Sequence, residues 1–187
     1  MAEQPSPGKK ARSSFRSPDP HFGMQAPVTK RMTITTPGGL SGTVTTSKTV
    51  ELANANDPLS LLKLTAKVTT NGRTSQSVYE AVNKTLTTLS AAGRQRVSYL
   101  NDKGRVVRET VPGLAEVSYI YDNRGRLTTV IEGQGEEARM LTISYDSATG
   151  YLGQITDALQ RTVQFSRDAV GRVLVQTLPD GREIRSL

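Results

Sequence analysis

The residue types that most often perform chemistry in proteins are sparse in this chain. It has no cysteine and a single histidine, His21, in a stretch rich in proline and serine. The absence of cysteine excludes disulfides, thiolate metal sites and cysteine nucleophiles, and His21 has no acidic cluster at ligand spacing. The Tyr-Asp pairs at 121–122 and 145–146 could act as acids, but each aspartate begins a turn, where a structural hydrogen bond explains it. We therefore expect no catalytic residue, no metal and no enzyme activity.

One glycine-rich segment resembles a dinucleotide-binding fingerprint. Residues 133–138 read Gly-Gln-Gly-Glu-Glu-Ala, which fits the pattern Gly-x-Gly-x-x-Ala after strand-like residues 127–131. Only residues 136–140 could be helical before the next strand-like segment, whereas a crossover helix needs about ten or more residues. The segment is interpreted as a long polar hairpin turn, and no cofactor is expected.

Arginine recurs directly after the turns and could form a basic rim. The arginines in question are Arg94, Arg105, Arg126, Arg161, Arg172 and Arg182. Equal turn spacing is expected to bring them to the same edge of a sheet. The favoured interpretation is that they pair with neighbouring turn aspartates. The alternative is that they bind sulfated or acidic glycans.

A regular spacing of turns organises the chain from about residue 28 onward. Short segments rich in threonine and valine alternate with turns, most of them ten or eleven residues apart. An Asp or Asn side chain at the start of such a turn can accept hydrogen bonds from backbone amides, and Gly or Asn suits a final position with positive φ. The expected turn residues are Asn83, Gly93, Gly104, Asp122, Gly125, Asp146, Gly150, Asp168, Gly171 and Gly181. A spacing of twenty-one residues, as from 83 to 104 and from 104 to 125, then corresponds to one up-and-down pair of strands.

Alternation along the segments predicts strands with one apolar side. Val117, Tyr119 and Tyr121 share one face, and residues 141, 143 and 145 repeat the pattern, while the opposite faces are mixed. We therefore expect an all-β fold, an open strip of β-hairpins stacked strand upon strand rather than a closed sandwich. Residues 76–90 also fit helical spacing, so a helix is the alternative there, although their threonine content favours two strands.

The charge and the N-terminal composition set further expectations. The formal charge is +7, of which residues 1–31 contribute +4, leaving +3 for the rest of the chain. A nearly balanced body predicts no specific nucleic-acid partner. Residues 1–27 contain five prolines among serine, lysine and arginine, and we expect them to be a disordered tail. No apolar run is long enough to span a bilayer, and no signal peptide is recognisable.

The turn units resemble the YD (RHS) repeat family. Residues 121–127 read Tyr-Asp-Asn-Arg-Gly-Arg-Leu, and residues 145–152 repeat the unit with one inserted residue. Family units read approximately Tyr-Asp-x-x-Gly-Arg-Leu followed by a Thr-rich strand, and residues 155–161 and 178–182 are similar to half-repeats. The resemblance covers residues 60–187, with 28–59 as a degenerate form of the same β region. It implies a β-strip that spirals into a hollow shell, which encloses a toxic C-terminal domain in bacterial toxin systems and lies at the cell surface in other members.

The resemblance implies a structural function. The expectation is a non-catalytic repeat module from a bacterial RHS protein, a partial turn of the spiral truncated within a repeat at its C-terminus. Its implied partners are further RHS repeats or a companion shell protein, with a toxin domain as cargo, in a secreted or envelope-associated setting. Two alternatives stay open: an adhesion module that binds carbohydrate or polyanions, and a truncated reading frame without independent function.

Overall fold

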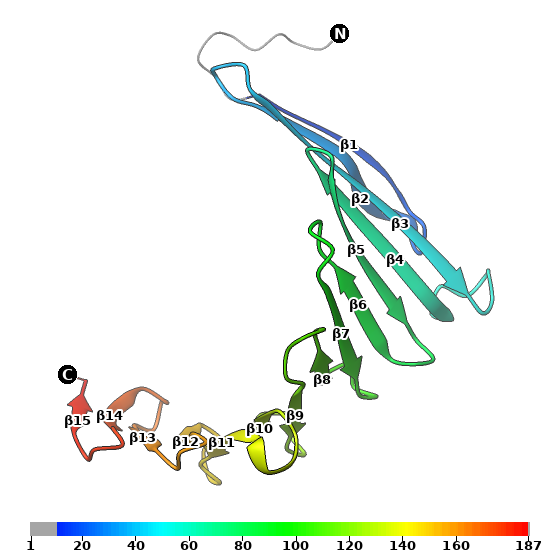
Figure 1. Ribbon diagram of the computed structural model, residues 1–187. Coiled ribbons are helices and arrows are strands. Elements are labelled where there is room, and N and C mark those ends of the chain that lie inside the picture. Colours follow the sequence, from blue (N-terminus) through cyan, green and yellow to red (C-terminus); the bar gives the residue numbers. More distant parts are fainter. Residues whose placement is uncertain (1–10, 187) are drawn as a thin grey trace. The chain divides into compact units, whose positions relative to one another are not determined.

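The computed structural model describes residues 11–186, which form antiparallel β-strands (Figure 1). The chain divides into two units, Met1–Arg105 and Val106–Leu187. Within each unit, strands that are consecutive in sequence are neighbours in an open sheet. The all-β prediction is confirmed. In the described part of the chain, no helix has the length and apolar character needed to cross a membrane.

The first unit is a meander of seven strands. They are β1 (Ala11–Asp19), β2 (Gly23–Thr35), β3 (Ser41–Leu52), β4 (Leu61–Thr70), β5 (Arg73–Glu80), β6 (Thr85–Leu89) and β7 (Gln95–Leu100). Strands β5 and β6 occupy the segment that also fitted helical spacing, and they pair from Gln76 with Leu89 to Glu80 with Thr85. The preference for two strands over a helix is confirmed.

The second unit continues the same pattern with shorter strands. They are β8 (Val106–Thr110), β9 (Val117–Tyr121), β10 (Leu127–Glu132), β11 (Arg139–Tyr145), β12 (Leu152–Thr156), β13 (Thr162–Arg167), β14 (Val173–Thr177) and β15 (Glu183–Arg185). The glycine-rich segment lies in the loop between β10 and β11, where its only helical feature is the three-residue 3₁₀ turn η1 (Gly135–Glu137). It is a hairpin loop, as interpreted from the sequence.

The N-terminal region differs from the disordered tail that its composition predicted. Residues 11–27 are ordered in β1 and β2, which pair from Ala11 with Thr35 to Asp19 with Gly23. The Asp19 carboxylate closes their turn, because it accepts hydrogen bonds from the amides of His21 at 2.8 Å and Phe22 at 3.2 Å and from Lys48 Nζ on β3 at 2.9 Å. Strand pairing and this ion pair provide the interactions that composition alone did not reveal. Residues 1–10 of the predicted tail lie outside the described residues.

Each unit has one apolar face, and the opposite face is threonine-rich in the first unit and mixed in the second, where Ile131 pairs with Met140. In the second unit, Tyr119, Val130 and Leu141 lie opposite one another on adjacent strands. Ile143 and Ile155 continue this face across β11 and β12. In the first unit, Val50, Leu64, Tyr79 and Leu86 form the equivalent ladder across β3 to β6. Threonine predominates on the opposite face of the first unit, as in the paired residues Thr45 and Thr69.

Neither sheet is covered by a second layer within the described residues. Among the described residues, the main contacts between strands are those of sequence neighbours. Consequently no apolar side chain of residues 11–186 is buried, and the only buried polar side chains there are Asp19 and Ser98. The apolar faces are half-buried by their own cross-strand neighbours and otherwise open. Backbone ladders, cross-strand pairs and turn hydrogen bonds therefore hold the strands together.

Candidate functional site

Three turns of the second unit share an arrangement that we call the aspartate–arginine clasp, formed by Asp122 with Arg126, Asp157 with Arg161, and Asp168 with Arg172. The arginine amide donates to the aspartate Oδ1 at 2.8, 2.9 and 2.9 Å in chain order. The arginine Nε donates to Oδ2 at 2.8, 2.7 and 2.6 Å. The aspartate amide donates back to the arginine carbonyl at 2.9, 3.0 and 3.0 Å. One carboxylate thus closes the turn through both main-chain and side-chain donors.

The clasps fix the ionisation of their carboxylates. The amide of Arg126 is the main cause that lowers the pKa of Asp122. The guanidinium groups of Arg161 and Arg172 are the main causes that lower the pKa of Asp157 and of Asp168. A carboxyl group that stays ionised at neutral pH cannot donate a proton as a general acid, which needs a raised pKa. The clasp aspartates are therefore poorly suited to act as general acids.

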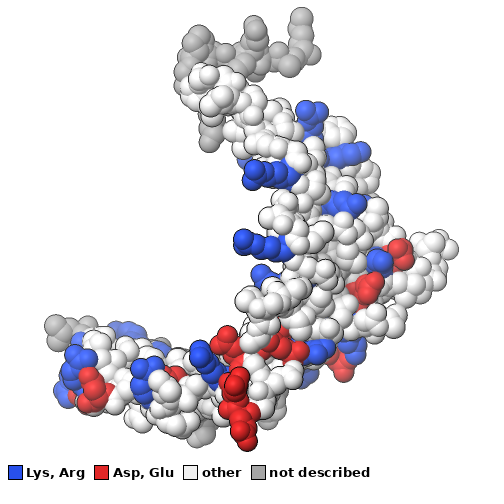
Figure 2. All heavy atoms as spheres, in the orientation of Figure 1, with Lys and Arg blue, Asp and Glu red and all other residues white. Residues whose placement is uncertain are grey.

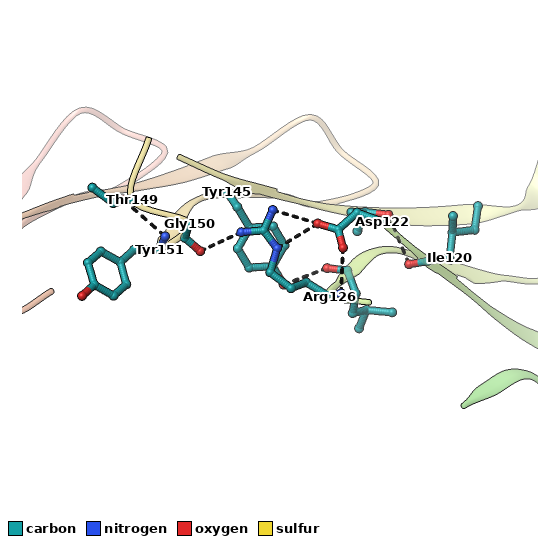
Figure 3. A network of polar contacts seen from close by, with 9 residues as sticks. Ile120, Asp122, Arg126, Tyr145, Thr149, Gly150 and Tyr151 are labelled. Atoms are coloured by element: carbon teal, nitrogen blue, oxygen red, sulfur yellow. Dashed lines mark hydrogen bonds and ion pairs between the residues drawn. The ribbon is translucent and has the colours of Figure 1, made fainter. Parts of the chain in front are cut away.

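Arg126 does more than close its own turn (Figure 3). Its Nη1 donates to the carbonyl of Gly150, in the next YD-like turn, at 2.8 Å. Its guanidinium lies over the Tyr145 ring, 4.1 Å from the centroid, and the Tyr145 hydroxyl donates to the Leu127 carbonyl at 2.9 Å. With 29% of its side chain exposed, Arg126 is much less accessible than Arg172 at 79%. Arg126 therefore joins two consecutive YD-like units, a role that the sequence reasoning missed.

The turn with the inserted residue uses a different closure. Asp146 Oδ1 accepts from the Thr149 amide and hydroxyl, both at 2.7 Å. The Thr149 hydroxyl is the main cause that lowers the pKa of Asp146. The residue after Gly150 is Tyr151, where the other turns have arginine, so Thr149 provides the side-chain donor to the carboxylate.

The residues predicted to end the turns, six glycines and Asn83, fall at left-handed backbone positions with one exception. The glycines among them have positive φ: Gly93 (+78°), Gly104 (+71°), Gly125 (+80°), Gly150 (+77°), Gly171 (+88°) and Gly181 (+82°). Asn83 does not, and the residue with positive φ in its turn is Lys84, at +49°. The Lys84 amide donates to the Ala81 carbonyl at 3.3 Å, so that turn ends one residue later than the sequence suggested. The Asn83 side chain donates to Glu80 at 3.3 Å instead.

The six turn arginines do not line one edge of a sheet. Consecutive turns of a meander lie at alternate ends of the strands. In the second unit, Arg126 and Arg172 follow the turns after β9 and β13, whereas Arg161 and Arg182 follow the turns after β12 and β14, at the opposite edge. Arg94 and Arg105 lie at opposite ends of β7. The expectation of a single basic rim is therefore wrong.

Local pairing describes most of these arginines better. Besides the three clasps, Arg182 Nε lies 2.5 Å from Asp180 Oδ2. The Arg94 amide donates to the Ser90 hydroxyl, and the Arg105 amide donates to the Asn101 side chain, both at 3.0 Å. Their turns thus use the same backbone closure with an uncharged acceptor.

His21 lies in the turn between β1 and β2 rather than in a solvated tail. Its Nε2 contacts the Pro58 carbonyl, and its ring lies 4.1 Å from that of Phe22. Among the described residues, no cluster of three or more histidine, aspartate and glutamate side chains could hold a metal ion. His21 thus connects the turn between β1 and β2 with the loop between β3 and β4.

The positive charge is concentrated in the first unit. Residues 11–105 carry thirteen Lys and Arg against five Asp and Glu, a net of +8, whereas residues 106–186 carry nine against eleven, a net of −2. In Figure 2, lysine and arginine side chains project along the upper part of the molecule with no acidic side chain beside them. Dividing the charge between residues 1–31 and the rest of the chain does not reveal this difference between the units. Lys30 and Arg31 on β2 belong to the same unit as Lys67 on β4.

Comparison with known proteins gives similarity to solved structures only. No protein-family model and no curated protein sequence matches the chain. Among solved structures, it is similar to the crystal structure of TcdB2-TccC3-Cdc42, with 13% identity over 91% of this chain and 10% of that chain, at a TM-score of 0.49. It is also similar to the crystal structure of TcdB2-TccC3-TEV, with 12% identity over 91% of this chain and 10% of that chain, at a TM-score of 0.48. The third is the structure of the Photorhabdus luminescens Tc holotoxin pore with a mutation in TccC3. Its identity is 12% over 97% of this chain and 11% of that chain, at a TM-score of 0.47.

The chain thus spans about a tenth of the length of these structural neighbours. Likenesses at these TM-scores carry no weight for fold or activity, so the function of the chain has to be inferred from its own strands and turns.

Proposed function

We propose that the chain is a non-catalytic structural module, a segment of β-strip that forms part of a larger shell. The observation that carries this proposal is the open single-layer sheet, in which no apolar side chain of residues 11–186 is buried. A chain of this length ordinarily buries more than half of its surface around a core. Here the apolar faces of both units have no cover within the described residues, so a neighbouring structure must provide it.

The turn clasps support a structural task over a catalytic one. Their carboxylates are held ionised and are engaged by arginine at short distances, as for Asp168 and Arg172 at 2.6 Å. Stacked repeat units of this kind contact only their neighbours and gain stability from each added unit. The link from Arg126 to Gly150 is such a contact between consecutive units.

The resemblance of residues 121–127 to the YD repeat supports a more specific proposal. The strip forms part of the wall of a bacterial RHS shell, with further repeats or a companion shell protein as partners. The shell either encloses a toxin domain as cargo or lies at the cell surface. The protein is in both cases secreted or associated with the cell envelope. Glycan binding by the turn arginines is less favoured, because four of the six are engaged by aspartates.

The proposal is tested by urea unfolding of the full chain at low and high protein concentration. An uncovered apolar face predicts low stability in dilute solution and a midpoint that rises with concentration, as further copies cover that face. Ile143→Asn, on the apolar face, should reduce the concentration dependence. Ser144→Asn places the same side chain on the opposite face and should leave it unchanged. A stable monomer with a midpoint independent of concentration would overturn the proposal.

A further inference from the structure

A groove on the polar face of the first unit combines cations, hydroxyls and an aromatic ring. It has a volume of about 480 Å³. Its lining residues are Phe15, Lys30, Arg31, Thr45, Thr46, Ser47, Lys67 and Thr69. They come from the four adjacent strands β1 to β4. None of them takes part in the turn clasps.

A β-bulge brings two consecutive cations to this groove. Phe15 pairs with Arg31 and Arg16 pairs with Thr29, so Lys30 is an extra residue with no partner on β1. In a regular strand, Lys30 and Arg31 would point to opposite faces, but a bulge redirects the side chain of the extra residue. Both therefore line the same groove as Lys67. The sequence shows only a Lys-Arg pair and gives no sign of this.

The cations of the groove have no acidic partner among the described residues. Lys30, Arg31 and Lys67 are all exposed, and none of the three is in an ion pair within residues 11–186. Two acidic groups of the same unit are engaged by other lysines: Asp19 by Lys48 at 2.9 Å and Glu80 by Lys63 at 3.5 Å. The groove is thus a positively charged surface that its own sheet does not neutralise, in a unit whose residues 11–105 carry a net charge of +8.

The lining indicates the chemistry of a ligand. Cations favour sulfate or carboxylate groups, and serine and threonine hydroxyls can donate to and accept from sugar hydroxyls. Phe15, with 61% of its surface exposed, offers an apolar ring on which the carbon face of a sugar can pack. Single-stranded nucleic acid is less suited, because its binding surfaces stack successive bases on several aromatic rings, and Phe15 is the only aromatic residue that lines this groove.

We propose that this groove binds a sulfated or carboxylated polysaccharide. The site goes beyond the structural function proposed above. It differs from the turn arginines because it lies on a sheet face and its cations have no ion-pair partner within residues 11–186. The proposed shell role does not depend on ligand binding by this groove. The urea experiment that tests the shell role contains no ligand, so either proposal can fail without the other.

The test measures binding of the full chain to heparin fragments, polygalacturonate fragments, neutral dextran and an oligothymidylate. The chain should bind the two acidic polysaccharides, with sulfated and carboxylated sources distinguished by their relative affinities, and should not bind dextran. Arg31→Gln with Lys67→Gln should weaken binding about tenfold, as expected when two exposed charge contacts are lost. Arg94→Gln with Lys103→Gln removes the same charge outside the groove and should have little effect. Phe15→Ala should weaken binding without changing its dependence on salt.

Three results would overturn the assignment. Equal losses in the two double variants would attribute binding to net charge alone. Absence of binding to both acidic polysaccharides would remove the ligand, and tighter binding of oligothymidylate would assign the groove to nucleic acid. Circular dichroism and urea midpoints of each variant establish that lost binding is not lost folding.

Discussion

Replacing Arg126 by alanine should destabilise the second unit far more than the same change at Arg172. Both arginines clasp an aspartate four residues earlier, and both retain their amide bond to that aspartate as alanine. Only Arg126 also bonds the Gly150 carbonyl at 2.8 Å and covers the Tyr145 ring at 4.1 Å. The comparison therefore isolates the link between consecutive repeat units.

The magnitude follows from the two additional contacts. A hydrogen bond from a charged donor contributes about 1.5–3 kcal/mol, and a partly exposed cation–π contact contributes about 0.5–1 kcal/mol. Allowing for partial relaxation, Arg126→Ala should lower the free energy of unfolding by about 2–3 kcal/mol. Arg172 is 79% exposed and has only its aspartate partner, so its replacement should have an effect close to experimental error.

Urea unfolding at one fixed protein concentration measures both effects. With an m-value of about 2 kcal/mol/M, the Arg126→Ala midpoint should fall by on the order of 1 M. Arg126→Lys should be intermediate, because an ammonium keeps the charge but cannot bond Asp122 and Gly150 at once in the geometry of the planar guanidinium. Equal midpoints for the two alanine variants would refute the inter-repeat role of Arg126.

Glycine substitutions and acid titration give three further checks, all read as urea midpoints. Gly125 has φ +80°, so Gly125→Val should lower the free energy of unfolding by about 1–2 kcal/mol through backbone strain. Gly125→Asn should lower it less. Equal stabilities of the two variants would contradict the turn assignment. Gly171→Ala should cost about 1 kcal/mol more than Gly181→Ala, because the new Cβ would lie 2.6 Å from Tyr151 Cζ at the first position and has no atom within 4 Å at the second. Removing the ring by Tyr151→Ala should abolish that difference, and a persistent difference would exclude the ring as its cause. The pKa of Asp122 is lowered from 3.8 by folding. The contribution of its ionised carboxylate to stability is therefore complete above that value and is lost as pH falls through and below it. A urea midpoint that holds or rises on acidification from neutral pH to about pH 3 would contradict this expected loss of stability.

The sequence predicted those features that depend on a few consecutive residues. The turn at 122–126 needs an acceptor at its start and a residue that tolerates positive φ before its end, and both are visible as Asp122 and Gly125. The same local chemistry favoured two strands over a helix in residues 76–90. The alternation of Leu141, Ile143 and Tyr145 showed the apolar face because side chains alternate along any strand.

Features that depend on distant partners could not be predicted in this way. The order of β1 requires pairing with β2 and an ion pair from Asp19 to Lys48, twenty-nine residues away. The contact of Arg126 with Gly150 spans twenty-four residues. The groove of the first unit requires a bulge at Lys30, which only the strand register determines.

The alternating edges of the turns show a different kind of error. The ten- and eleven-residue spacing was correctly recognised, but each step along a meander reverses the chain direction. Arginines one step apart, such as Arg161 and Arg172, therefore lie at opposite edges. Only those an even number of steps apart, such as Arg126 and Arg172, can share an edge.

The most direct test of a sheet open on both faces is the alkylation of single cysteines in the full chain. The natural sequence contains no cysteine, so Ile143→Cys and Thr142→Cys each introduce a unique thiol, on the apolar and the opposite face of β11 respectively. In dilute solution without denaturant, both thiols should react with a maleimide on the same timescale, because no second layer covers Ile143. A thiol at position 143 that stays unreactive until the chain unfolds, beside a freely reactive thiol at position 142, would show a covered core and contradict the single-layer account.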